Sequence, residues 1–86
     1  MQRESVLLYP LVTEKTVKMI ERENKLVFVI APNASSDEVA REFEKTFEVK
    51  IQRVNVLRRP DGVKVAFIKL AEGYSASDIS VKLRIL

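Results

Sequence analysis

The residues of this sequence that are best equipped to bind a ligand are arginines and lysines gathered between residues 53 and 69. Two apolar stretches, 51–57 and 63–70, flank turn residues at 58–62, a pattern that predicts a β-hairpin. A guanidinium fork binds phosphate bidentately, and each neutralised phosphate releases counterions. The hairpin is therefore a candidate polyanion site, or alternatively an edge hairpin that charge protects from aggregation. Its basic residues are Arg53, Arg58, Arg59, Lys64 and Lys69.

Two further polar groups are candidates for ligand contacts. Thr13 has the pattern of a helix N-cap and is followed by Glu14, Lys15 and Lys18. A helix N-terminus attracts anions, although the residues alone favour an ordinary capped helix. Asn55 interrupts the apolar stretch 51–57 and offers both a donor and an acceptor, either to neighbouring backbone or to a ligand.

The sequence contains neither cysteine nor histidine. This excludes disulfides and cysteine zinc sites, and it removes the commonest general base and metal ligand. We therefore expect no enzyme, no catalytic residue, no metal and no cofactor. Aromatic stacking of bases has little support, because the phenylalanines fit core positions and only two tyrosines are expected at the surface. These are Phe28, Phe43, Phe47 and Phe67, and Tyr9 and Tyr74.

The 86 residues suffice for one small domain, which we expect to span residues 1–86. The formal net charge of +3 is unevenly distributed, with −2 over residues 1–48 and +5 over residues 49–86. Such asymmetry is typical of a basic surface for a polyanion, or simply of solubilising charge. The longest apolar run, 26–31, is too short to span a membrane, and no signal-peptide pattern is present, so we expect a cytosolic protein.

Periodicity and turn residues predict the order strand, helix, strand, helix, strand, strand, helix. The strands are expected at 6–9, 25–31, 51–57 and 63–70, and the helices at 13–22, from Ser35 or Ser36 to 47, and from Ser75 or Ser77 to 83. The stretch 25–31 is apolar on both parities, which predicts a central strand covered on both faces. Strands joined through a helix are usually parallel, and the hairpin is antiparallel. The prediction is an α+β split βαβ plait with a mixed, mostly antiparallel four-stranded sheet packed by helices.

Four separated segments resemble the universal large-subunit ribosomal protein family L-twenty-three. They are YPLVTEK at 9–15, ENKLVFVI at 23–30, FEVKIQRVNVL at 47–57 and KVAFIKL at 64–70, in the same order and with compatible spacing. The short hairpin turn resembles the archaeal form, since the chain lacks the long loop of bacterial members. One departure is Val65, where many relatives have a basic residue.

The resemblance implies a non-enzymatic structural constituent of the large ribosomal subunit, cytoplasmic and ribosome-bound. It implies binding to large-subunit ribosomal RNA near the polypeptide tunnel exit, contact with ribosomal protein L-twenty-nine, and a docking site for signal recognition particle. No membrane span and no small-molecule substrate are expected. The RNA-binding residues expected from the motifs and the basic hairpin together are Thr13, Glu14, Lys15, Lys18, Asn24, Lys25, Arg53, Asn55, Arg58, Arg59, Lys64 and Lys69.

We expect RNA on the side of Lys15, Lys18, Lys25 and the hairpin, with the acidic face of the second helix, around Glu38, Glu42 and Glu44, pointing away. Three other classes of protein fit the sequence less well. An RNA-recognition-motif domain would need a glycine-containing, aromatic-rich strand, and 64–70 has one aromatic and no glycine. A regulatory plait that binds a metabolite would form a stable homodimer, and an acylphosphatase-like enzyme would need an anion loop that is not found.

Overall fold

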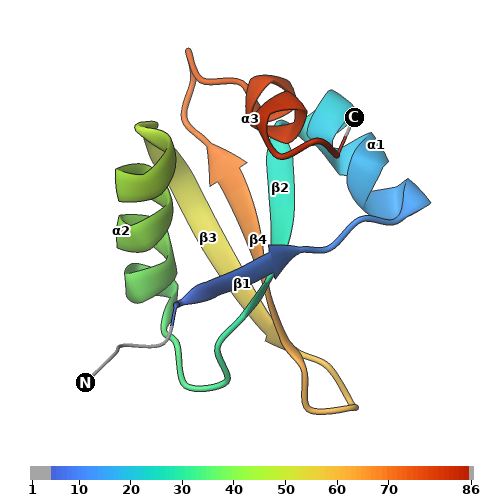
Figure 1. The fold of residues 1–86 in the computed structure, drawn as a ribbon, viewed down its shortest axis with the longest axis vertical. Helices are drawn as coiled ribbons and strands as arrows, with labels where there is room; N and C mark the ends of the chain where they lie inside the picture. Colours follow the sequence, from blue (N-terminus) through green and yellow to red (C-terminus); the bar gives the residue numbers. More distant parts are fainter. Residues whose placement is uncertain (1–4, 86) are drawn as a thin grey trace.

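The computed structural model describes residues 5–85 of the chain and contains the elements in the predicted order (Figure 1). The strands and helices are β1 (Leu7–Pro10), α1 (Glu14–Glu23), β2 (Lys25–Ile30), α2 (Ser36–Phe47), β3 (Ile51–Arg58), β4 (Lys64–Leu70) and α3 (Ala76–Lys82). No helix in this part of the chain is long and apolar enough to cross a membrane.

Each helix begins at a hydroxyl side chain, as the sequence predicts. Thr13, Ser35 and Ser75 each accept a hydrogen bond from the backbone N–H three residues later. At α2 the Glu38 carboxylate in turn accepts a hydrogen bond from the Ser35 N–H at 3.0 Å, which completes a capping box. The first two helices end at Asn24 and Glu48 in left-handed backbone conformation, with φ of 56° at both.

The four strands form one sheet in the order β1-β2-β4-β3, and every neighbouring pair is antiparallel. The strands β2 and β3, which are joined through α2, run in the same direction with β4 inserted between them. This arrangement is the predicted split βαβ unit. Because β4 separates the two parallel strands, the sheet has no hydrogen-bonded parallel pair and is antiparallel rather than mixed.

The predicted parallel crossover is wrong for β1 and β2, which are antiparallel neighbours. A crossover must carry the chain back along the full strand before the next one begins. Instead α1 lies beyond the end of β1, beside α3, and its left-handed C-cap at Asn24 leads straight into β2 (Figure 1). The helix therefore acts as a long hairpin connection.

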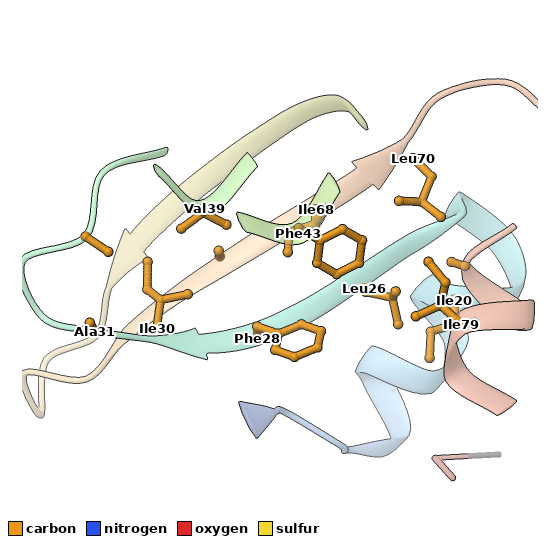
Figure 2. Packing of buried hydrophobic residues seen from close by; sticks show 13 residues of the cluster. Ile20, Leu26, Phe28, Ile30, Ala31, Val39, Phe43, Ile68, Leu70 and Ile79 are labelled. Carbon is orange, nitrogen blue, oxygen red and sulfur yellow. The ribbon is translucent and has the colours of Figure 1, made fainter. Parts of the chain in front are cut away.

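The main core lies on the face of the sheet that α2 and α3 cover. Phe43 of α2 is fully buried and meets the ring of Phe28 edge-on, with centroids 5.8 Å apart, while Phe47 packs against both rings. Figure 2 shows Ile79 of α3 beside Ile20 of α1, close to Leu26. We call this side of the sheet the covered face.

The opposite side of the sheet, here called the open face, carries a much smaller apolar cluster. Val27, Val29 and Val65 are buried there, and Leu11 and Met19 pack against them from β1's end and from α1. Neither α2 nor α3 contributes to this cluster. β2 is therefore buried on both faces, as predicted for a central strand.

Candidate nucleic-acid interface

Three basic side chains form one row across the open face. The sheet register places Lys25 of β2 opposite Lys69 of β4, and Lys69 opposite Arg53 of β3. Residues directly opposite one another in antiparallel strands point to the same face, with neighbouring strands about 4.8 Å apart. Arg53 and Lys69 of the hairpin therefore lie side by side on this face, and Lys25 joins them.

The three cations of the row differ in whether an acidic residue of the chain neutralises them. The Lys25 Nζ lies 3.2 Å from a carboxylate oxygen of Glu23, and its side chain is mostly buried. Arg53 is exposed and Lys69 half-buried, and neither forms an ion pair with any residue in the described range 5–85. Arg53 and Lys69 are thus the two cations of the row that remain available to an external anion.

The charged residues of the strands are all basic. Its four strands, all within residues 5–85, contain five basic residues and neither aspartate nor glutamate. The acidic residues of α2 are Asp37, Glu38, Glu42, Glu44 and, at its C-cap, Glu48, on an element that packs on the covered face. The acidic helix and the basic row therefore lie on opposite sides of the sheet. The predicted separation of this helix from the whole basic hairpin does not hold at the tip, where Arg58 and Lys64 lie on the covered face.

One acidic side chain of α2 has a structural task that the sequence did not indicate. A carboxylate oxygen of Glu44 accepts a hydrogen bond from the Ile51 N–H at 2.9 Å. This bond ties α2 to the first residue of β3 and satisfies an amide at the start of an edge strand. Of the three predicted acids, Glu44 therefore stabilises the fold, as Glu38 does through the capping box at the start of α2.

Two further rows of side chains lie beside the basic row on the open face. The nearer row contains an aromatic and a polar side chain, and the next row is apolar. Phe67 stands between Val27 and Asn55, and in the next row Tyr9, Val29, Val65 and Leu57 follow one another across all four strands. Tyr9 is 55% exposed and Leu57 54% exposed. Asn55 is exposed beside Phe67, so its amide points to solvent on the open face rather than into the core.

The expected core position of Phe67 is wrong with respect to the main core. Its ring lies on the open face, partly exposed, and packs against the valine cluster there. The three other phenylalanines lie in the main core, as predicted. Sequence reasoning missed Phe67 as a surface aromatic because both parities of β4 are apolar, and periodicity alone does not tell which parity faces the helices.

The tip of the hairpin forms a second, separate basic group. Arg58 pairs with Lys64 across the hairpin, in register with Ile30, which places both on the covered face. The Lys64 Nζ donates to the carbonyl oxygen of Ala34 at 2.7 Å, and Arg59 forms a 2.9 Å ion pair with Asp61. The short turn is confirmed, but the tip residues do not converge with the row on the open face.

The start of α1 has the geometry of a capped helix. The Thr13 Oγ1 accepts from the Thr16 N–H at 3.1 Å, while the Thr16 Oγ1 accepts from the Thr13 N–H at 2.8 Å. Lys18 lies 3.6 Å from the carboxylate of Glu14, and both side chains are largely exposed. Lys15 is exposed one turn before Met19, so it stands on the side of α1 that borders the open face.

Both polar atoms of the Asn24 side-chain amide form hydrogen bonds within the fold. The Nδ2 donates to the Tyr74 carbonyl at 2.9 Å, and the Oδ1 accepts from the Ala76 N–H at 2.7 Å. Asn24 also holds the left-handed conformation that ends α1, which asparagine tolerates better than most residues. The side chain thus fixes the start of α3 against the junction of α1 and β2, and its predicted RNA contact remains a prediction.

The fold and this surface define a class of protein: a small split βαβ plait with an open, basic sheet face. No cluster of acidic side chains placed to hold a metal ion occurs among residues 5–85. The chain belongs to the ribosomal protein family described as "Ribosomal protein L23", whose family model matches residues 5–78. The large ribosomal subunit protein uL23 of Methanothermobacter thermautotrophicus is 46% identical to it over 79 residues, which are 92% of each chain. Members of this family are ribosomal structural proteins and not enzymes.

Proposed function

We propose that this protein is a structural constituent of the large ribosomal subunit and binds large-subunit ribosomal RNA through the open face of its sheet. Residues 1–86 act as a single RNA-binding domain in this proposal. Family membership supports the ribosomal assignment, and the name of the 46% identical relative places that relative in the large subunit. The protein acts in the cytoplasm as a ribosome-bound component.

The observation that carries the RNA-binding proposal is the row of Lys25, Lys69 and Arg53 on a sheet whose strands have no acidic residue. A phosphate backbone laid along this row meets two cations that have no partner in residues 5–85. No carboxylate from the strands opposes it. Lys15, at the border of the open face, extends the contact to phosphates further away.

The finer assignments concern the place of the protein in the particle. We propose that it lies near the polypeptide tunnel exit, beside ribosomal protein L-twenty-nine, and helps form a docking site for nascent-chain factors such as signal recognition particle. An RNA-facing open face leaves α2, on the opposite side of the sheet, free to meet protein partners. Its outer side presents the exposed side chains of Asp37, Arg41 and Lys45, a mixed charge pattern suited to protein contacts.

The proposal is tested by titrating the purified protein with large-subunit ribosomal RNA fragments over a series of salt concentrations, with an unrelated structured RNA as competitor. The expected result is a selective complex whose log affinity falls steeply with log salt. Equal affinity for both RNAs would reduce the open face to a generic basic surface. Absence of binding at low salt would overturn the proposal.

A further inference from the structure

We propose that the open face receives an unpaired RNA nucleotide whose base stacks on Phe67, while its phosphate lies on the row of Arg53 and Lys69. This inference rests on the proposed function and deepens it, because it states which structural class of RNA the face binds. The juxtaposition that carries it is an aromatic ring on a central strand, directly beside a cationic row.

The position of Phe67 matches what a stacking platform requires. β4 is an interior strand, so Phe67 lies near the middle of the open face, with Val27 on one side and Asn55 on the other. The two smaller neighbours leave the ring partly exposed. Aromatic rings placed in this way on four-stranded sheets stack bases, and stacking tolerates every base because each has a π-face.

The surrounding side chains supply the other parts of a nucleotide contact. Asn55 is exposed next to the ring and offers both a donor and an acceptor to the edge of a stacked base. The cationic row lies two residues further along the same strands, about 7 Å away. The distance between the ring and the cations is therefore similar to the distance between the base and the phosphate of one nucleotide.

The apolar row beyond Phe67 argues for unpaired nucleotides and against a duplex. Tyr9 and Leu57, at the two ends of this row, are both more than half exposed. Double-stranded RNA presents phosphates and hydroxyls and would leave these side chains without apolar contact. Unstacked bases cover apolar surface, and the sheet's lack of carboxylates favours a polyanion over a protein.

The test uses three variants of the full chain. Phe67→Leu keeps an apolar side chain over the valine cluster but removes the ring, and Phe67→Tyr retains the ring. Phe67→Trp introduces the only tryptophan of the chain, whose fluorescence reports stacking directly. Circular dichroism and a thermal melt of each variant establish that it is folded before binding is measured.

Titration with a large-subunit ribosomal RNA fragment that the wild type binds is expected to separate the variants. Phe67→Leu loses about tenfold in affinity or more, at the scale of one lost base stack, while Phe67→Tyr stays within about threefold of wild type. The fluorescence of Phe67→Trp is quenched in proportion to complex formation. A fully paired RNA duplex produces no quenching.

Two results would overturn the stacking while leaving the proposed function intact. In the first, Phe67→Leu binds RNA with the affinity of the wild type, whereas Arg53→Gln binds more weakly. Binding by the open face would then be purely electrostatic. The other is tight binding of Phe67→Trp with unchanged emission. Failure of the wild-type protein itself to bind any large-subunit fragment would overturn the proposed function and the stacking together.

Discussion

Replacing Asn24 with alanine tests how far one side chain holds the two ends of the fold together. Its amide bonds the backbone at Tyr74 and Ala76, fifty residues and more along the chain, at 2.9 and 2.7 Å. The substitution removes both bonds and forces alanine into the left-handed conformation at φ 56°. Each bond contributes roughly 0.5–1.5 kcal/mol net, and the conformation costs alanine about 1 kcal/mol.

The expected loss in the free energy of unfolding is therefore about 2–4 kcal/mol, measured by urea denaturation followed by circular dichroism. In a chain of this size the melting temperature falls by roughly 8–30 °C. Asn24→Gly is the matched control, since it loses the bonds but adopts the left-handed conformation freely, and it should cost about 1 kcal/mol less than alanine. A change below about 0.5 kcal/mol in Asn24→Ala would refute this account of the side chain.

Three further substitutions follow from the same contacts. Ser35→Ala removes the N-cap of α2 and should lower the unfolding free energy by about 1 kcal/mol in urea, whereas Ser36→Ala, one position on, should change it little. Lys64→Met removes the donor to the Ala34 carbonyl and should lower the free energy of unfolding by about 1 kcal/mol. Amide hydrogen exchange around residues 32–35 should become faster, and an unchanged exchange rate would contradict this contact. Phe43→Ala empties the centre of the core and should cost about 3–5 kcal/mol, enough to unfold much of the protein at 37 °C; a cooperative melt near the wild-type temperature would be incompatible with the packing described.

The element order followed from local signals, because caps, turns and apolar runs act within a few residues. Thr13 and Ser35 cap their helices through bonds to residues only three positions away. The direction of β1 relative to β2 was not available from such signals. It depends on where α1 packs, and α1 lies against α3, which is more than fifty residues further along the chain.

The site could be predicted in part for the same reason. The pairing of Arg53 with Lys69 follows from hairpin register, which a short turn fixes. The roles of Lys64 and Asn24 in the fold depend on backbone groups in distant segments of the chain. Phe67 was expected in the core together with the other phenylalanines, because β4 is apolar on both parities and only the packing of α2 and α3 tells the two faces apart.

The central claim is that RNA lies on the open face, and one comparison of salt dependence tests it most directly. The variant Arg53→Gln/Lys69→Gln removes two charges from the open face, and Arg41→Gln/Lys45→Gln removes the same charge from α2 on the opposite side. Each is titrated with large-subunit ribosomal RNA from about 50 to 200 mM salt, the range over which phosphate contacts change affinity strongly. The slope of log affinity against log salt is expected to fall by roughly 2 in the first variant and to change hardly at all in the second. Equal slopes in the two variants, or a loss confined to the α2 variant, would contradict the claim.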